Sequence, residues 1–329
     1  LKGQLWSELR RTPLLPMAAL FLGVAAPWYG LATQANGTEF LGRFLGFSNL
    51  ERFTSVIYDH PGPPWFYLPW VLLLLLPWSL YLPVAAIRLR FWRLSVWRET
   101  PPGADLPLLA LLWLVLMVAF FSAAATKLPG YILPAIPGGS LLVTLLFLPL
   151  QPAAPHLAAG MRISGWCNAG LLALMGLAAA LAPRWLETDP SYPTFADALR
   201  ASGLPWLLAL PLLLAAIAVV VLLWRSRTGL GWLWVPNAAG MAAALALVLP
   251  VLVPLVDRER QLPIRALARL AAEQALPDEP LLVVGYKRYS VVYYSGRPVL
   301  FVPSPSKARR ALAARAQAGA GSASASPSS

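Results

Sequence analysis

Long stretches without charged side chains recur along the chain and predict its membrane-spanning segments. Seven stretches contain no Asp, Glu, Lys or Arg, and each is at least as long as the roughly 20 residues that a helix needs to cross a bilayer. Because lipid offers an exposed backbone no hydrogen-bond partner, we interpret these stretches as helices. The predicted spans lie at about 13–34, 65–87, 106–126, 131–150, 164–183, 204–224 and 233–256.

The pattern changes after Val256. Residues 261–276 place apolar side chains at helical spacing and predict an amphipathic helix. Runs of β-branched and aromatic residues at 281–285, 290–295 and 298–302 then predict three short strands. The fold class is therefore an all-α polytopic membrane protein with about seven transmembrane helices and a small C-terminal α/β domain. We expect a membrane domain over 1–256, the α/β domain over 257–303 and a disordered tail, rich in Ala, Ser and Gly, over 304–329.

The positions of Lys and Arg predict the orientation of these spans. With the N-terminus inside, the inner segments hold Lys2, Arg10, Arg11, Arg88, Arg90, Arg93, Arg98, Arg162, Arg225 and Arg227. The outer loops then hold only Arg43, Arg52, Lys127, Arg184 and Arg200. This bias places residues 36–64, Lys127 and the whole α/β domain on the outer face.

Composition agrees with a multi-pass protein of the plasma membrane, the inner membrane of a bacterium. Hydrophobic residues make up 58% of the 329 and charged residues 12%, about half of what a soluble domain carries. The net charge of +12 needs no nucleic-acid partner, because much of it marks topology and the rest suits an anionic membrane surface. The chain begins with Leu1 rather than Met, so we expect it to be a portion of a longer protein.

Lys127 is the one formal charge between Asp105 and Arg162, and it falls between two apolar segments. Its ammonium is expected at a membrane surface, because burying it mid-bilayer is costly. There it either extends to water as an anchor or holds a phosphate. Pro134 and Pro137, which follow, should unwind the start of the next helix and free backbone groups near the lysine. Gly170, Gly176 and Gly240 are interpreted as helix-packing positions.

The first outer loop holds the remaining candidate chemistry. Glu39, Glu51, Asp59 and His60 are oxygen and nitrogen donors for a divalent metal ion, although their spacing is loose. Arg52, between apolar neighbours, suits a phosphate or carboxylate, while a capping or topological role is an equal alternative. Gly-rich phosphate loops, nucleophile elbows and Cys/His metal spacings do not occur in the sequence.

Several of these segments together resemble a known family. They are Ala26-Pro-Trp-Tyr29, Asn49-Leu-Glu-Arg-Phe53, His60-Pro-Gly-Pro-Pro-Trp-Phe-Tyr-Leu-Pro69, Pro77-Trp78, Phe120-Phe-Ser122 and Lys127-Leu-Pro-Gly-Tyr-Ile-Leu-Pro134. In this order they resemble the later portion of the polyprenyl-phosphate-dependent glycosyltransferases, which include lipid A aminoarabinose transferases and, more distantly, protein O-mannosyltransferases. The similarity covers roughly residues 10–140, and the Lys-Leu-Pro-x-Tyr element is its most specific part.

The resemblance implies an enzyme of the cell envelope that transfers a sugar from a polyprenyl-phosphate carrier to a lipid or protein acceptor on the outer face. It makes Arg52, Lys127 and Tyr131 ligands of the carrier phosphate. The family's acidic catalytic loop has no counterpart here, so the catalytic residue stays unknown. A family histidine before the Arg-Phe pair corresponds to Ser48 or Asn49, which leaves His60 as the nearby imidazole for a metal ion.

Two other classes of function stay open at this point. A transporter or flippase for a lipid-linked sugar would place ionisable residues near the bilayer midplane. The seven predicted spans lack such residues, which disfavours this class. A non-catalytic membrane subunit or truncated product is the second alternative, because no base is identified.

Overall fold

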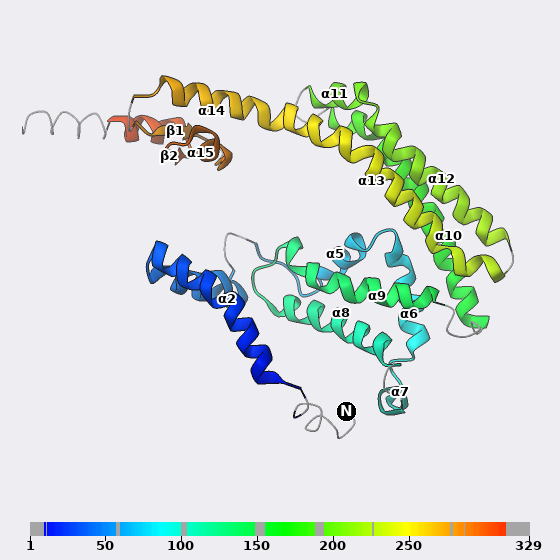
Figure 1. Cartoon of the computed structure of the whole chain (residues 1–329). Helices are drawn as coiled ribbons and strands as arrows, with labels where there is room; N and C mark the ends of the chain where they lie inside the picture. Colours follow the sequence, from blue (N-terminus) through cyan, green and yellow to red (C-terminus); the bar gives the residue numbers. More distant parts are fainter. Residues whose placement is uncertain are drawn as a thin grey trace, which may run out of the picture. The chain divides into compact units, whose positions relative to one another are not determined.

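The spans predicted from charge spacing are helices in the structure, a computed structural model (Figure 1). It describes residues 10, 12–56, 60–99, 104–148, 155–187, 194–225, 227–276, 279–285 and 287–313. In this part of the chain, six helices are long and apolar enough to cross a membrane, and a bent pair makes up a seventh span. The fold class of an all-α polytopic membrane protein is confirmed.

Contacts divide the chain into two compact units, Leu1–Leu177 with Ala209–Ala243 and Ala178–Leu208 with Ala244–Ser329. The first unit begins with α2 (Leu14–Asn36), α3 (Glu39–Leu41), the π-helix η1 (Gly42–Glu51), α4 (Arg52–Thr54), α5 (Tyr67–Leu74), the 3-10 helix η2 (Trp78–Tyr81), α6 (Leu82–Leu89), α7 (Leu94–Glu99), α8 (Leu106–Ala123), the 3-10 helix η3 (Pro129–Ala135) and α9 (Ile136–Phe147). The two units share α10 (Pro155–Leu186), α12 (Leu204–Trp224) and α13 (Trp234–Val256), and the 3-10 helix η4 (Arg227–Trp232) lies in the first.

Close backbone approach holds these helices together. α8 and α9 run side by side (Figure 1), and a Cβ at Gly138 would lie 2.9 Å from the carbonyl oxygen of Ala110. A Cβ at Gly176 would lie 2.9 Å from Leu213 Cγ, which confirms that glycine as a packing position. Gly240 is confirmed in the same way by Ala215 Cβ at 2.7 Å. The prediction for Gly170 is wrong, because nothing lies within 4 Å of its hypothetical Cβ.

The second span is broken rather than continuous, which corrects the single helix predicted over 65–87. α5 ends at Leu74, and the following η2–α6 segment is bent from it by 109°. Pro77 lies in the break, where it can donate no backbone hydrogen bond. A break of this kind leaves backbone groups without helical partners, and in a membrane other parts of the protein must satisfy them.

Two asparagines supply those partners. Asn168 of α10 and Asn237 of α13 are both fully buried. The Asn168 amide nitrogen donates to the Pro77 carbonyl and to Asn237 Oδ1, both at 3.0 Å. The Asn237 amide nitrogen donates to Asn168 Oδ1 at 2.9 Å and to the Leu233 carbonyl at 2.8 Å, and the Tyr81 hydroxyl donates to Asn168 Oδ1 at 3.3 Å. All four amide N–H groups of this pair are therefore used.

The second unit adds α11 (Phe195–Ala201), the π-helix η5 (Asp257–Gln261), α14 (Leu262–Gln274), β1 (Leu281–Val284), α15 (Ser290–Ser295) and β2 (Val299–Val302). The amphipathic helix predicted over 261–276 is confirmed as α14, which packs against α15. The strand predicted over 290–295 is wrong, because these residues form α15.

Pairing of the strands gives the physical reason for this difference. β1 and β2 are parallel, with Leu281 opposite Val299, and parallel neighbours need a crossover that is usually a helix. Residues 305–313, expected to belong to a disordered tail, are helical, and 314–329 lie outside the described residues.

Candidate functional site

The segment after α8 runs extended against the loop between the first two spans. Ala124 has extended backbone angles, and the next three residues donate backbone hydrogen bonds to that loop. Ala125 N donates to Phe53 O at 2.8 Å, Thr126 N to Arg52 O at 3.1 Å and Lys127 N to His60 O at 3.0 Å. Thr126 Oγ1 also donates to the carbonyl of Ser55 at 2.8 Å. The segment thus pairs with a loop more than 60 residues earlier in the chain. These bonds fix the backbone of the candidate residues Arg52, His60 and Lys127.

Lys127 is buried, with 5% of its surface exposed, and its ammonium bonds the end of α8. Nζ donates to the carbonyls of Ser122 at 2.8 Å and Ala124 at 2.7 Å. A cation is favourable there, because the last carbonyls of a helix carry partial negative charge. Desolvation lowers the pKa of Lys127. Two of its three ammonium donors are used, and the third has no partner among the described residues.

Tyr67 and Gly62 shape the space around this lysine, and sequence reasoning gave neither a role. Lys127 Nζ lies 5.9 Å from the centre of the Tyr67 ring, within the range of a cation–π contact. The Tyr67 hydroxyl accepts from Leu128 N at 3.3 Å. A Cβ at Gly62 would lie 2.8 Å from Lys127 Cδ, so only glycine fits without displacing the lysine. Both residues belong to the His60–Pro69 motif, which is the sequence feature that could have pointed to them.

Arg52 and Tyr131 meet directly, although 79 residues separate them in sequence. Arg52 Nη1 in α4 donates to the hydroxyl of Tyr131 in η3 at 3.0 Å, and both side chains are half-buried. Tyr131 is placed by the 3-10 helix η3 at the start of the fourth span. The prolines therefore interrupt the α-helix there, but by tighter winding rather than by the predicted unwinding. The other N–H groups of the guanidinium have no partner in the part of the chain that the structure describes. Two parallel donors on such a fork suit a phosphate or a carboxylate.

An apolar core lies under these polar groups. Tyr67, Val71 and Leu75 of the second span pack with Ile132 and Ala135 of η3, all nearly or fully buried. This cluster connects the break in the second span to the helix turn that carries Tyr131. The candidate site therefore rests on a packed scaffold rather than on a loop alone.

Arg52 contacts Tyr131 through its side chain and the Lys127 segment through its backbone carbonyl, but the described residues do not gather a metal site there. His60 is exposed, and its carbonyl rather than its imidazole contacts Lys127. Glu39 forms an exposed ion pair with Arg43 at 3.4 Å. Among the described residues, no three His, Cys, Asp or Glu side chains are close enough together to hold a metal ion. Asp59 lies outside those residues.

Curated relatives confirm the resemblance inferred from the sequence motifs. No family model matches the chain. The chain is 36% identical over 176 residues to the undecaprenyl phosphate-α-4-amino-4-deoxy-L-arabinose arabinosyl transferase of Pseudomonas paraeruginosa. The matched stretch covers 53% of this chain and 29% of that protein. The enzyme of the same name from Aeromonas salmonicida is 34% identical over 189 residues, 57% of this chain and 31% of that protein.

Solved structures share the fold. The crystal structure of ArnT from Cupriavidus metallidurans bound to undecaprenyl phosphate aligns with a TM-score of 0.62 at 20% identity. The alignment covers 90% of this chain and 49% of that one. The apo structure of the same protein gives a TM-score of 0.57 at 21% identity. The chain thus spans about half the length of the solved relative and matches under a third of the curated ones.

Proposed function

We propose that this chain is part of a membrane glycosyltransferase that transfers a sugar from a polyprenyl-phosphate carrier to a lipid or protein acceptor. The names of the curated relatives support a 4-amino-4-deoxy-arabinosyl group as the sugar. The observation that carries the proposal is the Arg52–Tyr131 pair, fixed to the same extended segment as the Lys127 ammonium. Arg52 and Lys127 keep donors without partners among the described residues, which supports a role in holding a carrier phosphate.

The reaction requires cations of this kind. The bond between the anomeric carbon and the phosphate oxygen breaks, and the phosphate keeps the electron pair while the acceptor oxygen bonds to that carbon. Arg52 and Lys127 stabilise the negative charge that develops on the departing phosphate, and the Tyr131 hydroxyl orients the guanidinium. The proton of the acceptor hydroxyl passes to a base, for which we assign no residue of this chain.

Binding of the carrier tests this assignment. In lipid nanodiscs, polyprenyl phosphate should bind in a salt-sensitive way, because the contact is between charged groups. Arg52→Ala should weaken binding at least tenfold, and Tyr131→Phe less, since it removes only the orienting hydroxyl. Arg43→Ala is a matched control, because that arginine is 81% exposed in a surface ion pair. Equal binding by all three variants would reject the site.

We place the protein in the plasma membrane, the bacterial inner membrane, with this site on the outer face. The distribution of Lys and Arg supports this orientation. Single cysteines at Thr38 and Ser306 should both react with an impermeant thiol reagent in intact cells. Reaction at only one of them would contradict the predicted number of spans between them.

A divalent metal ion at His60 is a further part of the proposal. His60 is exposed, its backbone is fixed by the bond from Lys127 N to its carbonyl, and Asp59 precedes it in sequence, which together support the proposal. Metal analysis of the purified protein should find bound Zn²⁺ or Mn²⁺ that His60→Ala removes. Equal metal content in both proteins would exclude His60 as a ligand.

A further inference from the structure

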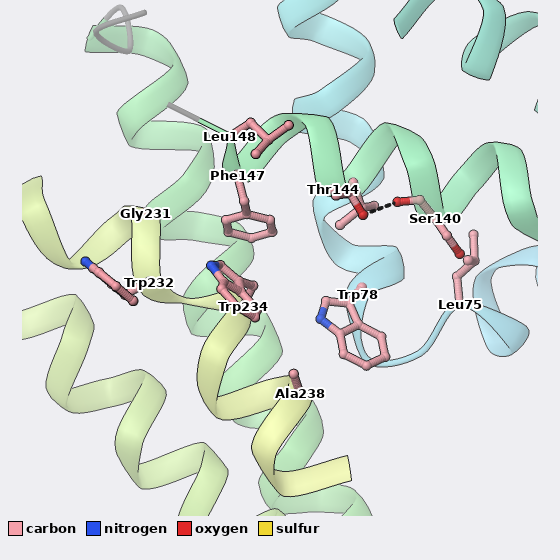
Figure 2. A pocket seen from close by; sticks show the side chains of 11 residues that line it. Leu75, Trp78, Ser140, Thr144, Phe147, Leu148, Gly231, Trp232, Trp234 and Ala238 are labelled. Carbon is pink, nitrogen blue, oxygen red and sulfur yellow. Dashed lines mark hydrogen bonds between the residues drawn. The ribbon is translucent and has the colours of Figure 1, made fainter. Parts of the chain in front are cut away.

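A cavity of about 690 Å³ lies in the first unit, beside the break in the second span (Figure 2). Leu75 and Trp78 line it from either side of the break, and Thr144 and Phe147 line it from α9. The opposite wall includes Trp232 at the end of η4 and Trp234 at the start of α13. In Figure 2, Trp78 and Trp234 lie on opposite sides of this space. Its volume falls within the roughly 300–1,000 Å³ of ligand-binding pockets.

The walls of this cavity suit a hydrocarbon chain rather than a sugar. Indole rings, Phe147 and Leu75 supply most of the lining. The Thr144 hydroxyl is already satisfied, because it donates to the Ser140 carbonyl of its own helix at 2.8 Å. A sugar would lose its hydrogen bonds to water on entering such a pocket, whereas an apolar chain would not.

The cavity is distinct from the Arg52–Tyr131 site. α9 begins directly after η3, which carries Tyr131, and runs away from it across the membrane. With a rise of about 1.5 Å per residue, Thr144 lies about 12 Å beyond the start of α9, and Phe147 lies further still. By the orientation predicted above, this end of α9 is in the cytoplasmic half of the bilayer.

A cation lies where the cavity approaches that surface. Arg88 Nη1 donates to the carbonyls of Leu145 at 3.3 Å and Leu146 at 2.9 Å, which directly precede the lining residue Phe147. Arg88 is half-buried, and its remaining N–H groups have no partner among the described residues. Arg90 and other basic residues follow on the same side of the membrane. Basic pockets between helices on this side suit anionic lipid head groups.

We propose that this cavity binds one acyl chain of an anionic phospholipid from the cytoplasmic leaflet, with its phosphate on Arg88. The buried Asn168–Asn237 pair keeps the pocket formed, because it fixes the break that carries Trp78. The lipid would fill the space left by the bent span and hold α9 against η4.

Photocrosslinking in nanodiscs tests this site. Phosphatidylglycerol with a diazirine on one acyl chain, as a minor component in phosphatidylcholine, should label Trp78, Phe147 or Trp232. Thr144→Trp fills the cavity and should reduce labelling at least fivefold. Thr33→Trp is the matched control, because Thr33 makes the same bond to the carbonyl four residues earlier on α2. Thr144→Leu is a milder variant that should reduce labelling if Thr144→Trp does not fold.

The head-group contact needs a separate comparison. Arg88→Gln should lower the ratio of labelling by phosphatidylglycerol to labelling by diazirine phosphatidylcholine at least threefold, whereas Arg98→Gln should leave it unchanged. Labelling spread evenly over the lipid-facing helices would overturn the proposal. Stronger labelling of Trp78 by a diazirine polyprenyl phosphate would assign the cavity to a different lipid and would also overturn it. Carrier binding at Arg52 should be unaffected by Thr144→Leu.

Discussion

At the C-terminal end of α8 and at the break in the second span, backbone carbonyls have lost their helical partners, and different side chains replace them. Lys127 bonds the carbonyls of Ser122 and Ala124 with a charged ammonium. Asn168 bonds the Pro77 carbonyl with a neutral amide. Both arrangements satisfy the backbone inside an apolar protein, where an unpaired carbonyl is costly.

The two regions differ in what remains unused. In the interior, every amide N–H group of Asn168 and Asn237 donates a hydrogen bond to the other asparagine or to the backbone. At the C-terminal end of α8, Lys127 keeps a positive charge and one donor, and Arg52 keeps several donors, that have no partner among the described residues. A fully used neutral network can only hold a structure together, while spare cationic donors can also bind a ligand. This difference predicts that variants in the two regions will fail in different assays.

The largest effect is expected from removing the positive charge of Lys127. Lys127→Met keeps the length of the side chain but removes its donors, and should reduce sugar transfer by the full-length protein at least 100-fold. Membrane insertion should be unchanged. Lys127→Arg should retain a small fraction of activity, because the charge stays while its shape changes. Near-normal transfer by Lys127→Met would leave only the helix-capping role.

Breaking the interior network should reduce stability more than activity. Asn168→Leu leaves the Pro77 carbonyl, one Asn237 N–H group and Asn237 Oδ1 without the partners they have in Asn168, while Asn237 still donates to the Leu233 carbonyl. It should lower the free energy of unfolding by about 2 kcal/mol. The double variant with Asn237→Leu should lose less than the sum of the singles, since both partners are then apolar. Unfolding in mixed micelles measures this, with exposed Asn36→Leu as control. Additive losses would show that the two asparagines act independently.

A smaller effect should follow from crowding the lysine without removing it. Gly62→Ala would place a Cβ 2.8 Å from Lys127 Cδ, so the lysine must shift. Carrier binding should weaken about threefold to tenfold, while the fold is kept. Gly46→Ala is the control, because nothing lies within 4 Å of its hypothetical Cβ. Unchanged carrier binding by Gly62→Ala would mean that the position of the ammonium does not matter.

The sequence predicted the region around Lys127 better than the interior network. Charge gaps located the spans, and the motif around Lys127 pointed to Arg52 and Tyr131. The break at Pro77 was missed because a search for charged residues gives no weight to Asn168 and Asn237, the neutral side chains whose hydrogen bonds stabilise the break. Only tertiary contacts show that these two asparagines face each other.

Tertiary pairing also decided the C-terminal domain. Residues 290–295 (Ser-Val-Val-Tyr-Tyr-Ser) have strand propensity, but they form a helix between two parallel strands. Sequence pattern gives each segment's local preference and not the direction in which its neighbours pair. The role of Lys127 as a cap was open to prediction, since it follows a helix end by four residues.

The smallest expected effect uses pH, because Lys127 carries the charge that should bind the carrier. Desolvation lowers the pKa of Lys127 below its usual 10.5, so the folded ammonium loses its proton before an exposed lysine would. Carrier binding should therefore fall as pH rises through this lowered pKa, while Arg52 stays charged. In the window between the folded and unfolded pKa values the unfolded chain binds more protons, so stability should rise with pH there.

If carrier binding falls with pH while the free energy of unfolding rises, both changes are assigned to the Lys127 ammonium. Lys127→Arg should flatten both curves, because a guanidinium keeps its proton throughout this range. Asn168→Leu should lower stability and leave the pH dependence of carrier binding unchanged, since Asn168 makes no contact with Lys127 or Arg52. Carrier binding that stays constant in the wild type through the pH range where stability changes, and that Lys127→Arg does not alter, would show that Lys127 only caps α8 and does not contact the phosphate.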